Sequence, residues 1–162
     1  MVIRTVSGGT AVTYQPKPVN ELIEYLNAYG PPAQEDDRRF NRAVKDICIS
    51  EPTPELVATV FRYLHQHSGP RFKDGNTVGR SQLRAFLERN LRLVEGEFLR
   101  VLDEKIWHLH VDLLRSAHRA GMRELAGVNL QDLVSRLASR DGHSLSVREG
   151  LQALAREMEE AG

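Results

Sequence analysis

The chain has 162 residues, of which 41% are hydrophobic and 27% charged, and its formal net charge at pH 7 is zero. This composition suits one domain or two small helical lobes, and the zero net charge argues against a freely acting nucleic-acid-binding protein. No apolar run approaches the ~20 residues of a membrane-spanning helix. The single cysteine, Cys48, cannot form an intrachain disulfide, and the N-terminus does not resemble a signal peptide, so we expect a cytoplasmic protein.

Residues 1–18 differ in character from the rest of the chain. β-Branched residues stand on both sides of Gly8-Gly9, and a Gly-Gly pair supplies the geometry of a tight hairpin turn. Pro16 and Pro18 end this stretch. The pattern predicts either a small hairpin or an N-terminal arm.

Three helices are predicted next. The first runs over residues 20–29, from Asn20 as N-cap to the Gly-Pro-Pro that follows it, and the second covers residues 34–49. The third has the clearest start signal, because Thr53 can cap it and Pro54 occupies the first helical position. It ends near His67.

The second half is also predicted to be helical. A helix over residues 78–90 precedes a long apolar-periodic run from Val94 to Gly121, and two helices follow over residues 130–138 and from Ser146 onward. The buried face of the long run is predicted from apolar residues three or four apart: Phe98, Leu102, Ile106, Leu109, Leu113 and Ala117. We therefore predict an all-α bundle of six to seven helices around one long central helix. Residues 19–162 form the helical domain, with possible lobes at 19–92 and 93–162.

The sequence favours a protein without catalysis, metal or cofactor. Two His-x-His pairs, at His65 and at His108, diverge by about 200° on a helix and cannot chelate from one face. No phosphate-binding loop, dinucleotide fingerprint, nucleophile elbow or His-Glu-x-x-His motif occurs. Glycine-containing loops at Asp74 and Asp141 lack the ligand spacing of a calcium loop.

Arginine rows are the strongest functional signal. Arg115, Arg119 and Arg123 are spaced i, i+4, i+8 along the predicted long helix, which places them on one stripe. The segment from residue 71 to 92 carries six basic and two acidic residues. Arginines along a rigid face can follow a phosphate backbone without reading bases. The basic residues of the second helix, Arg38, Arg42 and Lys45, are interpreted as an ordinary solvated face.

Four motifs follow one another in the order found in a known family. They are Val78-Gly79-Arg80 at the start of a basic helix, Glu95-Gly96-Glu97-Phe98-Leu99-Arg100-Val101-Leu102 at the start of the long helix, Leu113-Leu114-Arg115, and Val128-Asn129-Leu130-Gln131-Asp132-Leu133. Together they resemble the CasB-type small subunit of type I-E CRISPR Cascade complexes, or the small subunit of a related Cascade-like complex. The resemblance covers about residues 56–137 and includes the all-helical character and the length.

The resemblance implies a non-catalytic subunit that binds nucleic-acid backbone without sequence preference and helps to hold the opened target DNA. Its implied partners are the other subunits of the effector complex, a second copy of itself, the guide RNA and the target DNA. Arg80 and Arg115 match the motif arginines, and Arg84 and Arg119 lie one turn beyond them on the same stripes. Further candidates for phosphate contacts are Lys73, Arg89, Arg92 and Arg100.

An alternative reading of the same sequence has no nucleic-acid role. The chain would then be a helical adaptor or regulator of phage or plasmid type that binds a protein, and its arginine rows would meet an acidic partner or keep it in solution. Neighbouring genes that encode CRISPR subunits would favour the first reading.

Overall fold

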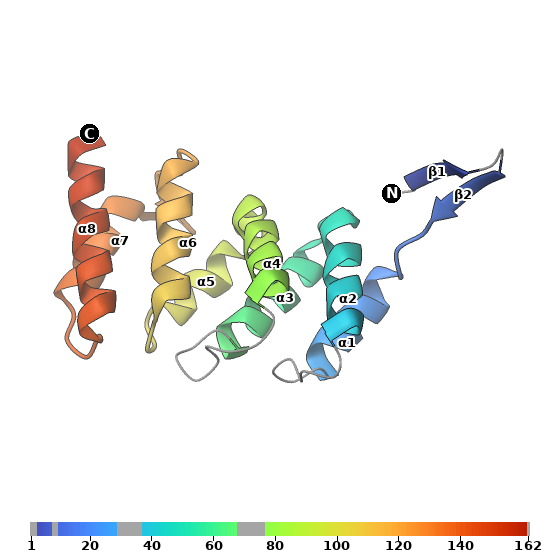
Figure 1. Ribbon diagram of the computed structural model, residues 1–162. Helices are drawn as coiled ribbons and strands as arrows, with labels where there is room; N and C mark the ends of the chain where they lie inside the picture. The colour runs from blue at the N-terminus through green and yellow to red at the C-terminus, as the bar shows by residue number, and fades with distance from the viewer. Residues whose placement is uncertain (1–2, 8–9, 29–36, 68–76, 162) are drawn as a thin grey trace. The chain divides into compact units, whose positions relative to one another are not determined.

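The computed structural model describes residues 3–7, 10–28, 37–67 and 77–161. In these residues the chain is all-α, as predicted, with eight α helices, one 3₁₀ helix and two short hairpins (Figure 1). Contacts divide the chain into two units: the first contains Met1–His67 and Asp74–Leu87, the second Ser68–Lys73 and Glu88–Gly162. Within the described ranges, no helix has both the length and the apolar character that crossing a membrane requires.

The first unit begins with an antiparallel hairpin. Strand β1 (Ile3–Ser7) pairs with β2 (Thr10–Tyr14), and Ile3 stands opposite Tyr14. A two-stranded hairpin is marginally stable alone in water. Its position therefore depends on its attachment to the helices through Tyr14, whose hydroxyl is hydrogen-bonded to Asp46.

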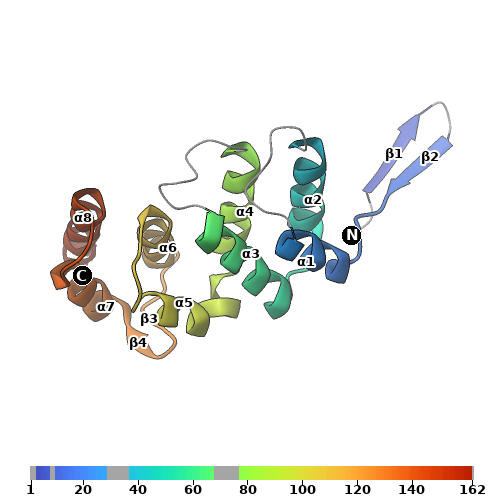
Figure 2. The same cartoon turned by 90° about the horizontal axis from the view of Figure 1, so that it is seen from below.

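Four helices build the core of the first unit. They are α1 (Val19–Ala28), α2 (Asp37–Ile49), α3 (Pro54–His67) and α4 (Thr77–Arg89), whose last two residues lie beyond the unit. Helix α1 packs against both α2 and α3 (Figure 2). The predicted cap of α3 is confirmed, because the Thr53 Oγ1 atom accepts a hydrogen bond of 3.1 Å from the Leu56 amide.

Helices α2 and α4 approach each other closely at Gly79. A Cβ atom added to Gly79 would lie 2.7 Å from Cε2 of Phe40, and the Phe40 ring is fully buried. Gly79 therefore has a packing role, which accounts for the glycine of the Val-Gly-Arg motif without any contact to a ligand.

Gly79→Ala is expected to destabilise the first unit by about 1–2 kcal/mol. Forcing a methyl group against a packed ring costs ~1–3 kcal/mol, which outweighs the helix propensity gained by losing a glycine. Gly96→Ala is the matched control, because no atom lies within 4 Å of the added carbon at that helical position; it should stabilise by about 0.5 kcal/mol. Thermal unfolding followed by circular dichroism measures both changes, and a stabilising Gly79→Ala would contradict the packing role.

The second unit contains the remaining elements. The 3₁₀ helix η3 (Leu91–Val94) leads into α5 (Glu95–Val101), and α6 (His108–Arg119) follows. A small hairpin of β3 (Glu124–Leu125) and β4 (Val128–Asn129) then connects to α7 (Leu130–Ser139) and α8 (Leu145–Ala161).

Helices α6 and α8 lie side by side and run in the same direction (Figures 1 and 2). Ser146 Oγ is 3.2 Å from Nε2 of His108 at their N-terminal ends, and Arg119 pairs with Glu157 at their C-terminal ends. Between these contacts, a Cβ atom at Gly150 would lie 3.3 Å from Val111. The two helices therefore share one interface along their length.

The predicted long central helix from Val94 to Gly121 is wrong. The described chain breaks it into η3, α5 and α6, with a non-helical segment between Leu102 and Trp107. All six residues predicted for its inner face are nevertheless buried, at 4% exposure or less. The apolar spacing identified the core side chains correctly, while the continuity of the backbone was misjudged.

Two sets of contacts stabilise the break. The Arg140 guanidinium, at the end of α7, donates hydrogen bonds of 2.7 Å to the Leu102 carbonyl and 2.8 Å to the Glu104 carbonyl. The Trp107 amide donates to Nδ1 of the buried His110 at 3.1 Å, which caps the start of α6. A distant arginine and a buried histidine thus satisfy backbone groups that a continuous helix would have paired internally.

Candidate nucleic-acid interface

Two of the predicted arginines lie on α4 in the first unit. The Nη1 atom of Arg80 donates a 2.9 Å hydrogen bond to the carbonyl of His67, the last residue of α3, and Arg84 is half-buried. Burial, together with the charge of Arg80, lowers the pKa of His67. Arg80 thus has a structural role at the end of α3. Lys73 lies outside the described residues.

Three predicted residues of the second unit are exposed. Arg89 is the last residue of α4, Arg92 lies in η3 and Arg100 in α5. The Arg100 side chain is 74% exposed, and its Nη2 atom is 3.9 Å from a carboxylate oxygen of Glu97. An exposed pair at this distance contributes little to stability. These guanidinium groups can therefore exchange their present surroundings for a phosphate at small cost.

Of the predicted stripe, Arg115 and Arg119 lie on α6 and are paired with carboxylates, whereas Arg123 lies beyond the end of that helix. Arg115 forms a 2.9 Å ion pair with Asp112. Arg119 donates two hydrogen bonds to Glu157, from Nε at 3.2 Å and from Nη2 at 3.0 Å. This pairing, reinforced by the charges of His118 and Arg115, lowers the pKa of Glu157. Arg115 and Arg119 stay predicted phosphate contacts, but a phosphate would have to replace these carboxylates.

Helix α2 carries a basic surface that the sequence analysis assigned to solvent. Its residues Arg38, Arg39, Arg42 and Lys45 are all exposed, and Lys17, from the segment before α1, is exposed as well. Lys17, Arg39 and Arg42 line one pocket, and Arg38, Arg42 and Lys45 line an adjoining open hollow. Among the residues that the structure describes, Asp46 is the only carboxylate that lines either of these two spaces. We call these five cationic residues the α2 face.

Two tyrosines from other elements support the α2 face. The Arg39 guanidinium lies over the ring of Tyr25 at 5.3 Å from its centroid. Arg42 and Lys45 lie 5.7 Å and 4.4 Å from the centroid of the Tyr14 ring. Cations at such distances are attracted by the ring, so the tyrosines restrict where these side chains point. Tyr14 comes from β2 and Tyr25 from α1, which is why the pattern is not visible in the sequence of α2.

Asp46 connects the hairpin to the α2 face. Its side chain is buried, at 1% residue exposure, and it accepts hydrogen bonds from the Tyr14 hydroxyl and, at 3.3 Å, from the Lys17 amide. The pKa of Tyr14 is raised, mainly by the hydrogen bond to Asp46 and secondly by burial. Both oxygens of the Asp46 carboxylate therefore accept hydrogen bonds from the protein itself.

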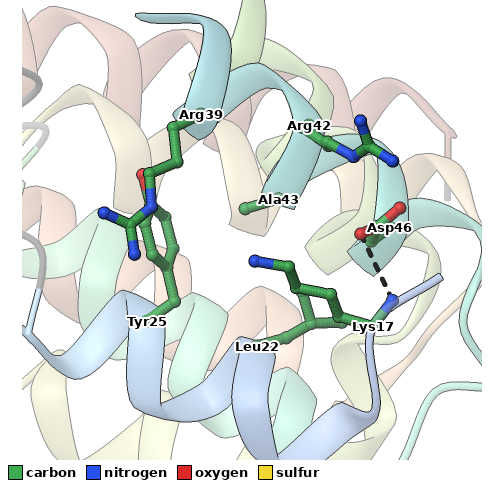
Figure 3. A pocket seen from close by; sticks show the side chains of 7 residues that line it. All are labelled: Lys17, Leu22, Tyr25, Arg39, Arg42, Ala43 and Asp46. Atoms are coloured by element: carbon green, nitrogen blue, oxygen red, sulfur yellow. Dashed lines mark hydrogen bonds between the residues drawn. The ribbon is translucent and has the colours of Figure 1, made fainter. Parts of the chain in front are cut away.

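The pocket between α1 and α2 is small and open to solvent. Lys17 extends across it toward Ala43, Arg39 lies against Tyr25 on one side, and Arg42 lies on the side of Asp46 (Figure 3). Its free volume is about 40 Å³, room for a group of about three oxygen-sized atoms, since ~10–15 Å³ of such volume holds one water. Leu22 forms part of its lining.

The described residues contain no group of three or more histidine, cysteine or acidic side chains that could hold a metal ion. A second hollow, of about 330 Å³, lies in the second unit between the ends of α6 and α8 and the start of α7. Met122, Leu130 and Met158 form its nearly buried apolar lining, and His118 and Arg123 also line it.

Comparison of the chain with protein-family models, with curated proteins and with solved structures returned no match.

Proposed function

We propose that this chain is a non-catalytic protein that binds nucleic-acid backbone without sequence preference. The observation that carries the proposal is the α2 face, where five exposed cations line two adjoining spaces. Asp46, the one carboxylate among the described residues of that lining, is buried and hydrogen-bonded within the fold. Phosphate contacts need cations on a rigid support and no base-reading geometry. The tyrosine rings beneath the cations supply part of that rigidity.

The motif resemblance supports a more specific role, as the small subunit of an RNA-guided CRISPR interference complex. Opening a DNA duplex against a guide RNA is nearly balanced in free energy, so modest backbone contacts can hold the opened state. The proposed partners are the other subunits of that complex, a second copy of this chain, and the guide RNA and target DNA backbones. Co-expression with the neighbouring genes tests this role, and failure of the chain to co-purify with any CRISPR subunit would count against it.

Salt-dependent binding tests the backbone contacts. Fluorescence anisotropy with labelled single- and double-stranded DNA of unrelated sequences should show weak binding that falls steeply with salt and ignores sequence. Replacing Arg38, Arg42 and Lys45 together with glutamine should lower the slope of log K against log salt by about two for single-stranded DNA, because each phosphate contact contributes ~0.7.

The matched control has the same change in charge elsewhere. Replacing Arg89, Arg92 and Arg100 together with glutamine removes three exposed cations predicted from the sequence. If this variant loses more affinity than the α2 variant, the interface lies in the second unit and not on α2. If neither variant changes the salt slope, or if wild type binds no DNA even at low salt, the backbone-binding function is wrong.

A second candidate function is that of a protein-binding adaptor. The hollow lined by Met122, Leu130 and Met158 favours it, since methionine-lined surfaces adapt to apolar side chains of a partner. A partner that co-purifies with wild type and is lost with Met158→Lys, while salt-dependent DNA binding is absent, would establish this function in place of the first.

A further inference from the structure

We propose that the pocket between Lys17, Arg39 and Arg42 is a site for a single phosphate monoester, as carried by a nucleotide or by the 5′ end of a nucleic-acid strand. The inference deepens the proposed function and rests on it, because the pocket belongs to the face assigned to nucleic-acid backbone. It adds a discrete site to a surface that would otherwise only attract polyanions.

Lys17 is held in place before any ligand arrives. It stands between Pro16 and Pro18, and a residue before proline is restricted to extended conformations. Its amide is bound to the buried Asp46 at 3.3 Å. The side chain then extends across the pocket toward Ala43 (Figure 3). A lysine whose backbone is fixed in this way loses less conformational freedom on binding than one in a mobile segment.

Arg39 approaches the same space from the opposite element. Its guanidinium is positioned over the ring of Tyr25, and Arg39 and Tyr25 together form the side of the pocket opposite Asp46 (Figure 3). A planar guanidinium suits bidentate contacts to phosphate oxygens. Arg42, which also lines the pocket, is about one turn further along α2; its guanidinium lies 5.7 Å from the centroid of the Tyr14 ring and adds a third positive charge at the rim.

The size and charge of the pocket favour a monoester. The free volume of about 40 Å³ admits a phosphate group but not a nucleobase. A monoester has three terminal oxygens and nearly two negative charges at pH 7, which matches three cations around the space. A backbone diester offers two such oxygens and one charge. The attached nucleoside would lie outside, next to the exposed side of Arg39, where a base can stack on the guanidinium plane.

The first experiment uses small probes. Thymidine monophosphate and thymidine are titrated separately into the full chain, with amide chemical shifts as readout. Saturable shifts at Lys17, Arg39 and Ala43 with the monophosphate, and none with the nucleoside, are expected. Arg39→Gln should weaken the monophosphate about 10-fold, the effect of one charge-assisted hydrogen bond. Arg136→Gln is the matched control, since Arg136 is exposed on α7 and belongs to neither candidate interface, and it should retain affinity within about 2-fold.

The second experiment compares the same oligonucleotide with and without a 5′-phosphate. A preference for the phosphorylated strand that disappears in Lys17→Met identifies the strand end as the ligand. If the monophosphate binds saturably but no oligonucleotide binds, the pocket is a nucleotide site and the proposed nucleic-acid-binding function is wrong. Salt-dependent oligonucleotide binding that ignores the 5′-phosphate, with no saturable monophosphate shifts, overturns the site and leaves the proposed function standing. Equal losses of monophosphate affinity in Arg136→Gln and Arg39→Gln also overturn the monophosphate site.

Discussion

Arg140→Ala will destabilise the second unit by about 3 kcal/mol. The guanidinium donates to the carbonyls of Leu102 and Glu104, at the point where α5 ends, and a hydrogen bond from a charged donor contributes ~1.5–3 kcal/mol. Alanine would leave both carbonyls without this donor. The stability of Arg140→Lys should lie between those of wild type and Arg140→Ala, because one ammonium group does not reproduce the guanidinium fork that spans two carbonyls.

Trp107 provides a local readout for this change. It is the only tryptophan of the chain, it stands at the start of α6, and its ring centroid is 4.7 Å from that of His110. Urea unfolding followed by its fluorescence should report a lower midpoint for Arg140→Ala. Arg136→Ala removes an exposed arginine from the same helix and should leave the midpoint nearly unchanged. Equal midpoints for the two variants would mean that Arg140 does not support the break.

Arg140 also explains why the break could not be predicted from the sequence. The apolar residues on the two sides of residues 103–105 are spaced as on one helix face, and all six predicted positions are buried. Local periodicity therefore favours a continuous helix. What ends α5 is a side chain 36 to 38 residues away, and single-sequence reasoning has no access to a contact at that separation. By contrast, the start of α3 was predictable because its cap, Thr53, is three residues from the amide that it binds.

The difference between contacts that are local in the sequence and contacts between distant residues also explains the outcome at the candidate interface. The arginine rows were identified from spacing along single helices, but spacing does not reveal that Arg119 faces Glu157 or that Arg80 faces the end of α3. The α2 face was missed for the converse reason. Its tyrosines come from β2 and α1, and only the fold places them under the basic residues. The Pro-Lys-Pro sequence around Lys17 was the one local signal available, and it was interpreted only as the end of the N-terminal segment.

Asp46→Ala will destabilise the first unit by about 2 kcal/mol and loosen the hairpin. The buried carboxylate accepts from the Tyr14 hydroxyl and from the Lys17 amide, and leaving a buried donor without its acceptor costs ~1–3 kcal/mol. For each of the two donors we expect the lower end of this range, about 1 kcal/mol, because Lys17 is exposed and Tyr14 is only half-buried. Thermal unfolding by circular dichroism measures the change, with exposed Glu51→Ala as the control.

The pH dependence of this contact has a defined sign. The pKa of Tyr14 is raised above its ordinary value of 10.0, first by the bond to Asp46. The folded state therefore holds the Tyr14 proton more tightly than the unfolded state, so this stabilisation is present below pH 10 and is lost as the pH rises through the raised pKa. In Asp46→Ala the Tyr14 titration, taken as the absorbance difference from Tyr14→Phe, should move down toward its ordinary value. An unchanged titration would show that the bond to Asp46 does not form.

Asp46→Asn separates charge from pre-organisation at the phosphate site. Removing a negative charge from the lining of a pocket strengthens the attraction of an anion on electrostatic grounds alone. An amide, however, offers one acceptor oxygen where the carboxylate offers two. It can keep both partners only if the Tyr14 hydroxyl accepts from its NH₂ group, and the bond that fixes the Lys17 amide loses its charged acceptor. We expect the loss of a fixed Lys17 to dominate and thymidine monophosphate to bind about 3-fold more weakly, less than the effect of a whole charge-assisted hydrogen bond. Tighter binding in a folded Asp46→Asn protein would show instead that the pocket acts through charge alone, without a pre-positioned lysine.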